Sequence, residues 1–120
     1  MTTTSDRLGV RGERIAAAYL TDIGLRVLDR NWRCREGELD LVARDGDALV
    51  FCEVKTRRGT GYGHPVEAVT RTKQRRLRRL AQRWLAAHDE HAPDLRFDVV
   101  GVLLRGEGPA VVTHLPGAFT

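Results

Sequence analysis

The sequence predicts a single α/β domain of three layers, a central mixed β-sheet flanked by helices. Two observations lead to this fold class. Apolar periodicity changes along the chain in the order α-β-β-β-α-β-β, and the 120 residues, 42% of them apolar, suffice for one core. No repeat, linker or low-complexity tract divides the chain. We therefore expect one domain over residues 1–120, with a flexible start at residues 1–6.

Two segments have apolar residues at helical spacing. The first is predicted to be a helix over residues 7–23, with Gly24 as its stop signal. The second is predicted to be a helix over residues 70–88. The inward stripes consist of Ala16, Tyr19, Leu20 and Ile23 in the first helix and of Leu77, Leu80, Ala81, Trp84, Leu85 and His88 in the second.

Five segments are predicted to be strands. Residues 25–30 form a short strand, followed by a polar connection over 31–37. Residues 38–44 and 49–55 form a hairpin, because the turn sequence Asp45-Gly46-Asp47 lies between them. A glycine-rich basic loop follows over 56–64, then a helical turn over 65–69. After the second helix, residues 97–104 form a buried strand and 110–115 an edge strand. Asp98, an acid inside the apolar strand, requires a partner such as Arg96.

The hairpin brings charged residues together. A turn at Gly46–Asp47 sets Asp40 opposite Glu53 and Glu38 opposite Lys55, with side chains about 5 Å apart at Cβ. Close carboxylates repel each other, and Mg²⁺ or Mn²⁺ would relieve the repulsion. A bound cation can activate a water for phosphodiester hydrolysis, and Lys55 would orient it. The alternative is a solvated sheet end with Glu–Lys pairs. The opposite face is predicted to be apolar: Leu39, Leu41, Ala43, Val50, Cys52 and Val54.

Glu13 is the third candidate acid. It lies near the edge of the inward stripe of the first helix, so it would reach the sheet end if this helix packs across it. The alternative is a surface glutamate paired with an arginine such as Arg14.

The second helix carries most of the positive charge. Residues 71–88 include seven Lys or Arg and no acid; since the whole chain has a net charge of +4, the remainder carries −3. Lys73 falls on the inward side and is expected to point toward the site. Arginines predicted on the outer face suit phosphate contacts, unless this is simply a solvated surface. They are Arg71, Arg75, Arg78, Arg79 and Arg83. The loop with Arg57 and Arg58, which follows Lys55, would close over a nucleic-acid backbone, or it is a plain connector.

These residues resemble a known family. Gly12-Glu13, Asn31, the segments 37–43 and 50–57, Lys73 and the segment 97–99 are similar to the bacterial YraN family. That family is placed with the restriction-endonuclease-like, or PD-(D/E)xK, superfamily, near archaeal Holliday-junction resolvases. The resemblance implies a restriction-endonuclease-like fold and extends over about residues 8–115. The proline of the superfamily name is absent, because Leu39 precedes Asp40.

The resemblance implies roles for single residues. Asp40 corresponds to the metal-binding acid of the first motif, Glu53 and Lys55 to the (D/E)xK pair, and Glu13 to the helix acid of resolvase-type enzymes. Metal ligands are then Glu13, Asp40 and Glu53, with Glu38 as an accessory acid and Mg²⁺ or Mn²⁺ as cofactor. Phosphate contacts are expected from Arg57, Arg58, Lys73, Arg75 and Arg79.

Three functions are compatible with these features. The first is a metal-dependent endonuclease that acts on DNA more readily than on RNA, on branched or single-stranded substrates. A homodimer would suit this function, because resolvase-like proteins act on two-fold symmetric substrates. The second is a non-catalytic nucleic-acid-binding module, and the third a scaffold that self-associates through its last strand. Cys34 and Cys52 have no disulfide or zinc spacing, and no segment is apolar enough for a signal peptide or membrane span. A cytoplasmic location without a membrane partner is expected.

Overall fold

The structure is a computed structural model that describes residues 4–59 and 69–119, and of residues 4–6 the backbone alone. Most of the predicted glycine-rich loop and helical turn therefore lies outside the described residues, as does the start of the predicted flexible segment. The elements along the chain are α1 (Thr4–Asp22), β1 (Arg26–Cys34), β2 (Gly37–Asp45), β3 (Ala48–Arg58), α2 (Arg71–His88), β4 (Asp94–Leu104) and β5 (Val111–Phe119).

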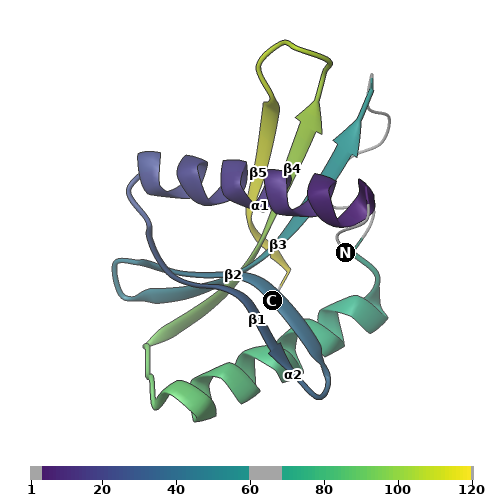
Figure 1. Ribbon diagram of the computed structural model, residues 1–120. Coiled ribbons are helices and arrows are strands. Elements are labelled where there is room, and N and C mark those ends of the chain that lie inside the picture. Colours follow the sequence, from purple (N-terminus) through teal and green to yellow (C-terminus); the bar gives the residue numbers. More distant parts are fainter. Residues whose placement is uncertain (1–3, 60–68, 120) are drawn as a thin grey trace.

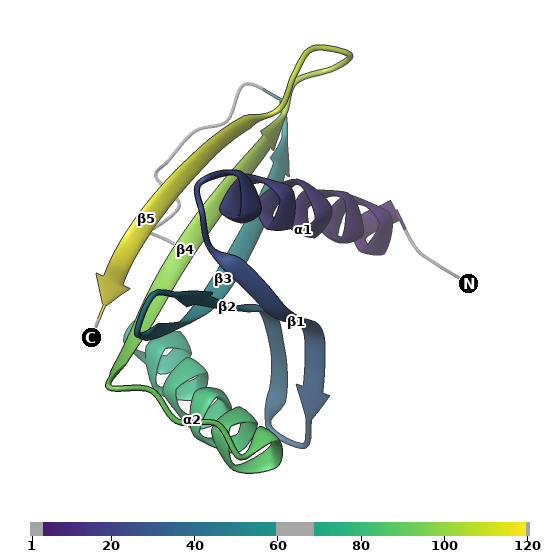
Figure 2. The ribbon, with the colours of Figure 1, turned by 90° about the vertical axis from the view of Figure 1, so that its left-hand side faces the viewer.

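The strands form one mixed sheet in the order β1-β2-β3-β4-β5. All neighbours are antiparallel except β3 and β4, which are parallel. A parallel pair needs a long connection from the end of one strand to the start of the next, and α2 lies in that connection. The two helices cover opposite faces of the sheet (Figures 1 and 2). The predicted α/β fold with flanking helices is confirmed.

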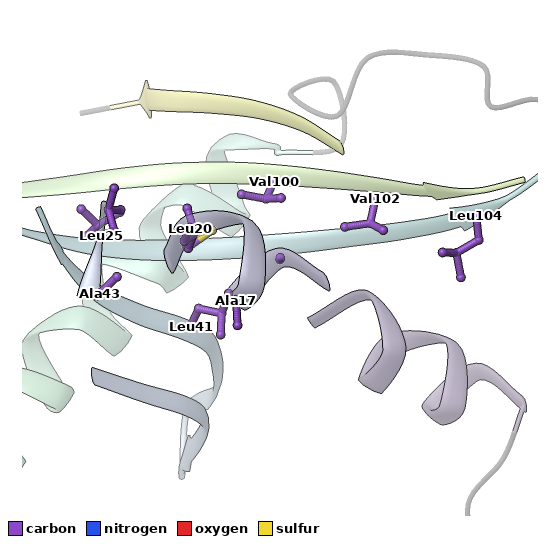
Figure 3. Packing of buried hydrophobic residues seen from close by; sticks show 11 residues of the cluster. Ala17, Leu20, Leu25, Leu41, Ala43, Val100, Val102 and Leu104 are labelled. Carbon is purple, nitrogen blue, oxygen red and sulfur yellow. The ribbon is translucent and has the colours of Figure 1, made fainter. Parts of the chain in front are cut away.

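Each helix buries one apolar cluster against the sheet. The cluster under α1 combines small helix residues with aliphatic side chains of β2, β3 and β4 (Figure 3). The cluster under α2 holds the two largest fully buried side chains, Trp84 and Phe51, whose rings pack edge to face at 5.9 Å. Because both faces are covered, the central strands are buried on both sides, as parallel sheet strands are.

The helix ends follow the predicted signals. Gly24 adopts φ +101°, a conformation open to glycine, and the Leu25 N–H donates to the carbonyl of Leu20 at 2.9 Å. Thr70 caps α2, because its hydroxyl accepts from the Lys73 N–H at 3.2 Å. Three details differ from prediction. His88, predicted on the inward stripe of α2, is exposed. Helix α1 already begins at Thr4, and Ile23, just beyond the last turn, is 48% exposed instead of buried.

The predicted polar connection over 31–37 is wrong for most of its length. Strand β1 continues to Cys34 and forms a hairpin with β2. The polar side chains of this segment concealed the strand, because on an edge strand they face solvent while Trp32 and Cys34 pack against the α2 cluster. The strand is bent at Asn31, which has φ 50°.

The bend also changes the predicted faces of β2. Leu39 was predicted on the same face as Leu41, but Leu39 belongs to the α2 cluster and Leu41 to the α1 cluster. The alternation of side chains between the two faces of β2 is interrupted opposite Asn31. The pairs on either side of this position are Trp32 with Leu39 and Arg30 with Leu41. Asp40 lies at this interruption.

Candidate functional site

The site lies where the pairing of β2 and β3 ends. Their register, from Asp45↔Ala48 to Leu41↔Cys52, is the predicted one and leads directly to Asp40 and Glu53. At that point Asp40 Oδ2 accepts a hydrogen bond from the Val54 N–H at 2.8 Å. The carboxylate thus accepts from a backbone N–H of β3 that would otherwise pair with a backbone carbonyl of β2.

Three carboxylates gather around this opening. Glu13 from α1 and Glu38 and Asp40 from β2 each offer an oxygen, and these oxygens lie within 4.8 Å of one another. We call them the acid triad. The predicted approach of Glu13 to the sheet end is confirmed. Glu38 was predicted to face Lys55, but it pairs across β1 with Arg33 at 3.4 Å, and it stands in the triad itself.

Asn31 is a site residue that the sequence reasoning did not assign. Its side chain hydrogen-bonds to Glu13, and its left-handed backbone bends β1 beside Asp40. Asparagine adopts this conformation more readily than other side chains with a Cβ. A lone asparagine between a tryptophan and an arginine was therefore the available signal, although a polar connection explained it equally well.

The acid triad is electrostatically strained in the absence of a cation. Burial raises the pKa of Asp40 to about 7, and the neighbouring charges of Glu13, Glu53 and Glu38 act in the same direction. The hydrogen bond from Val54 opposes them only in part. The pKa of Glu13 is also raised, first by burial and then by Glu38, against the hydrogen bond from Asn31.

Glu53 lies on the neighbouring strand and holds two lysines. Its Oε1 is 3.4 Å from Lys55 Nζ and 3.9 Å from Lys73 Nζ, so the predicted inward direction of Lys73 is confirmed. Within the described part of the chain, the other oxygen, Oε2, is buried without a hydrogen-bond partner. The pKa of Lys73 is lowered, mainly by the close approach of the Lys55 amine and then by burial.

Each of the two helices therefore contributes a charged side chain to the same end of the sheet. Glu13 comes from α1 and Lys73 from α2, on opposite faces, and both reach the opening between β2 and β3. Lys55 and Lys73 are also the two lysines of a chain that has 20 Lys and Arg together. An ammonium is compact and its pKa shifts readily on burial, whereas a guanidinium is larger and stays protonated.

Oxygen-only donors determine which ion the site would suit. Carboxylates are ligands for hard divalent cations such as Mg²⁺ and Mn²⁺, and Glu53 Oε2 is an unpartnered acceptor of the same kind. The residues present therefore fit the cofactor expected from the sequence.

The arginines that were predicted to contact phosphates are mostly exposed. Arg57 and Arg58 are exposed at the end of β3, and Arg75 and Arg79 are exposed on α2. Arg78 was predicted on the outer face but is half-buried, with its guanidinium 5.6 Å from the ring centre of Phe119. This exception arises because β5 extends to Phe119 and reaches the flank of α2.

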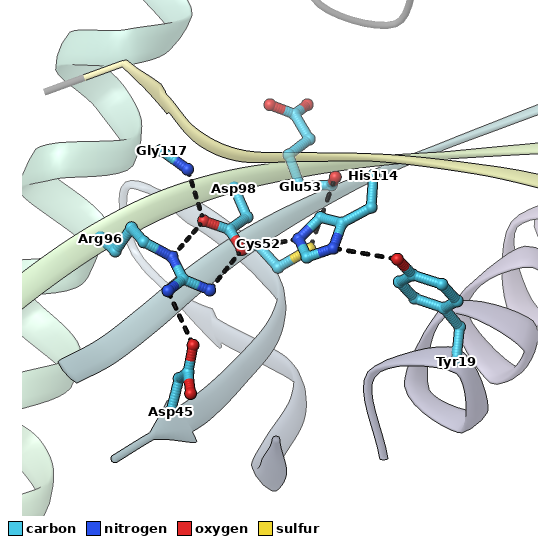
Figure 4. Close-up of polar contacts among 8 residues, drawn as sticks. All are labelled: Tyr19, Asp45, Cys52, Glu53, Arg96, Asp98, His114 and Gly117. Carbon is cyan, nitrogen blue, oxygen red and sulfur yellow. Dashed lines mark hydrogen bonds and ion pairs between the residues drawn. The ribbon is translucent and has the colours of Figure 1, made fainter. Parts of the chain in front are cut away.

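A second polar group lies apart from the acid triad. Asp98 is fully buried and accepts hydrogen bonds from Arg96, His114 and the Gly117 N–H, as Figure 4 shows. The predicted partner of Asp98, Arg96, is confirmed. Cys52 is buried in the core as a free thiol.

No helix among the described residues is long and apolar enough to cross a membrane.

Comparison with known proteins assigns a family. A family model described as "Uncharacterised protein family UPF0102" matches residues 12–102, which include all four residues Glu13, Asp40, Glu53 and Lys55. A UPF0102 protein of Beutenbergia cavernae is 61% identical over 112 residues, covering 93% of this chain and 95% of the relative. UPF0102 proteins of Frankia casuarinae and Frankia alni are 57% and 58% identical over 114 residues, covering 95% of this chain and 97% and 95% of the relatives. The chain belongs to the UPF0102 family.

Proposed function

We propose that this protein is a metal-dependent nuclease that hydrolyses phosphodiester bonds, an endonuclease acting on branched or single-stranded DNA. The observation that carries the proposal is the acid triad around Asp40. Three carboxylates with oxygens within 4.8 Å, one of them with a pKa of about 7, are unfavourable together unless a cation neutralises them. The element order supports a place in the restriction-endonuclease-like superfamily, close to the Holliday-junction resolvases.

The cation would be held by Glu13 and Asp40 of the acid triad together with Glu53, and Glu38, the third acid of the triad, would be an accessory ligand. When bound, Mg²⁺ or Mn²⁺ supplies positive charge that lowers the pKa of a water and stabilises charge developing on the phosphate. Asn31 fixes Glu13 through its hydrogen bond, and the Val54 N–H fixes Asp40. The carboxylates are thereby oriented in advance by groups that do not ionise.

The two lysines supply the remaining chemistry. Lys55 is held by Glu53 beside the triad, where its ammonium can orient the attacking water and stabilise charge on the phosphate. Lys73 binds the same carboxylate oxygen from α2 and adds a second positive charge. Exposed Arg57, Arg58, Arg75 and Arg79 contact neighbouring phosphates of the DNA backbone. A homodimer would present two such sites to a two-fold symmetric junction.

A non-catalytic nucleic-acid-binding module is the second candidate. One observation favours it, because Glu53 is already neutralised by Lys55 and Lys73 without any cation. In that case the acids serve only to anchor lysines, and the arginines of α2 bind DNA without cleavage.

Cleavage assays separate the two candidates. Purified protein is incubated with labelled single-stranded, duplex and four-way-junction DNA in Mn²⁺ or Mg²⁺. We expect Asp40→Ala and Lys55→Ala each to abolish cleavage while leaving DNA binding largely intact. Asp47→Ala, an exposed acid in the β2–β3 turn, is the control and should cleave normally. Full activity of either site variant contradicts the assignment, and binding without cleavage in any metal supports the second candidate.

Conservative lysine variants test why the site holds lysines. Lys55→Arg keeps the positive charge but replaces the compact ammonium by a larger planar group that is permanently protonated. We expect it to lose at least tenfold in cleavage rate, which corresponds to about 1.4 kcal/mol of transition-state stabilisation. Arg105→Lys, the reverse exchange at an exposed position in the β4–β5 turn, should cleave at the wild-type rate. Equal rates for Lys55→Arg and wild type would rule out a specific role for the ammonium.

A further inference from the structure

A basic pocket lies between α2 and the turn of the β1–β2 hairpin, which runs beside α2 in Figures 1 and 2. It has a volume of about 310 Å³ and is lined by Glu36, Thr72, Arg75, Arg76 and Arg79. The four helix residues recur at three- and four-residue intervals, so they form one stripe along α2 that faces the hairpin.

The positive charge of this pocket is not compensated. Among the described residues, no carboxylate forms an ion pair with Arg75, Arg76 or Arg79. Glu36 is the one acid among the described residues of the lining. Its Oε1 lies 3.1 Å from Arg83, one turn beyond the stripe, and its Oε2 accepts from the Cys34 thiol at 3.2 Å. Glu36 is thus drawn to one end of the pocket and leaves three guanidinium groups together, an arrangement that phosphate oxygens relieve.

The pocket adjoins the candidate site on two sides, through Glu53 and through Glu38. Thr72 precedes Lys73, whose ammonium reaches Glu53, so the first turn of α2 serves both places. On the hairpin side, Glu36 also lines a neighbouring pocket of about 410 Å³ whose wall includes Glu38 of the triad. The two pockets share Glu36, so Glu38 of the triad and the arginines of α2 lie on either side of this one residue of the hairpin turn.

We propose that this pocket binds a backbone phosphate of the DNA strand held at the acid triad, and that Glu36 is a built-in anionic competitor for it. Arg75, Arg76 and Arg79 take the phosphate. Glu36, which is paired with Arg83, repels the incoming strand, so that DNA binds against the negative charge of this carboxylate. The inference rests on the proposed function, because it places the substrate of that same site.

The arginines are tested by DNA binding without metal. Anisotropy of a fluorescein-labelled single-stranded oligonucleotide is measured in EDTA, so that cleavage plays no part. Arg75→Ala combined with Arg79→Ala should weaken binding at least tenfold and should reduce the slope of log K against log salt by about 1.4, the value for two phosphate contacts to a single strand. Arg26→Ala combined with Arg105→Ala removes the same charge from exposed positions outside the pocket and should have a much smaller effect.

Glu36 is tested by the opposite change. Glu36→Gln removes the competing charge and releases Arg83, so the dissociation constant should fall by about two- to fivefold, the value of one exposed ion pair. Glu107→Gln, in the exposed β4–β5 turn, makes the same chemical change and should leave the affinity unchanged. Circular dichroism of all variants verifies that the fold is intact.

The outcomes separate this inference from the proposed function. Equal affinities for the two double variants, or no tightening by Glu36→Gln, overturn the pocket even if the wild type cleaves DNA in Mn²⁺. The expected shifts without cleavage in any metal uphold the pocket and refute the nuclease. Absence of DNA binding by the wild type overturns both.

Discussion

Asp40 is the residue whose ionisation connects the site to the stability of the protein. Its pKa of about 7 in the folded protein, against an ordinary value of 3.8, means that the folded state favours the neutral acid. A group with a raised pKa contributes stability at pH values below its ordinary pKa and loses that contribution as the pH rises through the folded value. The loss here falls between about pH 4 and pH 7 and amounts to roughly 4 kcal/mol at most.

The first prediction follows from this sign. In metal-free buffer, the free energy of unfolding of the wild type should fall by roughly 2 to 3 kcal/mol more between pH 5 and pH 8 than that of Asp40→Asn. Urea unfolding at both pH values measures it. Mn²⁺ should restore stability to the wild type at pH 8 but not to the variant, because it binds only the folded, ionised site. Parallel pH profiles of the two proteins would contradict the raised pKa.

At this scale the sequence was informative where residues followed from a regular element. Helical phase pointed Glu13 and Lys73 to the sheet end, and the hairpin turn set the register that leads to Asp40 and Glu53. The role of Asn31 and the membership of Glu38 in the acid triad depend on the bend in β1. A left-handed residue inside a strand leaves no periodic pattern, so the role of Asn31 could not be derived from the sequence, whereas Glu38 was expected at the site as an accessory acid.

Helix α1 positions Glu13 through a close contact of its backbone with β3. Gly12 is buried, and a Cβ built there would lie 2.7 Å from both Cβ and Cγ2 of Thr56, well inside the contact distance of carbon atoms. Glycine is thus required at the residue before Glu13, where the helix crosses the strand that carries Glu53 and Lys55.

The second prediction concerns this contact. Gly12→Ala should destabilise the protein by about 1 to 3 kcal/mol, the usual cost of overpacking, and should reduce cleavage further by displacing Glu13. Gly9→Ala is the matched control, because the same helix has nothing within 4 Å of a Cβ at that position; it should be neutral or stabilising. Thr56→Gly should restore activity to Gly12→Ala. Full activity of Gly12→Ala alone would show that α1 tolerates displacement.

The elements themselves were predicted best where their cores are deepest. Both helices, the β2–β3 hairpin and β4 were recognised, since buried stripes and turns specify them. The edge strands were not delimited correctly. β1 is longer because its polar residues face solvent, and β5 continues past Pro116 to Phe119, whose ring stacks on Phe97 at 5.0 Å. A proline is tolerated there because the register shifts at this point of an edge strand.

At the scale of the whole molecule, the buried group around Asp98 adds polar contacts between α1, β2, β4 and β5, which also pack together in the apolar clusters. Arg96 connects Asp98 to Asp45 at the end of β2, His114 and Gly117 belong to β5, and the Tyr19 hydroxyl of α1 lies 3.3 Å from the His114 ring nitrogen (Figure 4). Burial alone would raise the pKa of Asp98, but these hydrogen bonds outweigh it and hold the pKa below its ordinary value. Asp98 therefore stays ionised throughout the pH range in which Asp40 titrates.

The last prediction tests whether this group is structural. Asp98→Ala should destabilise the protein by about 3 to 5 kcal/mol, because Arg96 and His114 lose the carboxylate that accepts their hydrogen bonds. Tyr19→Phe, which removes one hydrogen bond, should cost about 1 kcal/mol. Asp94→Ala, an exposed acid at the start of the same strand, is the control. Urea unfolding measures all three.

The same variants separate the two acid groups of the fold. Asp98 shares no hydrogen bond with the acid triad, so the cleavage rate of Asp98→Ala, corrected for its folded fraction, should equal that of the wild type. A loss of rate in fully folded Asp98→Ala would instead make Asp98 a positioning residue for the site. Because β4 pairs with β3 along its whole length, such coupling would have to pass through the strand that carries Glu53 and Lys55. The stabilising charge of Asp98 and the reactive charges of Glu53 and Lys55 would then be coupled across two neighbouring strands. In that case Lys55→Ala in the Asp98→Ala background would lose less cleavage rate than the sum of the two single losses.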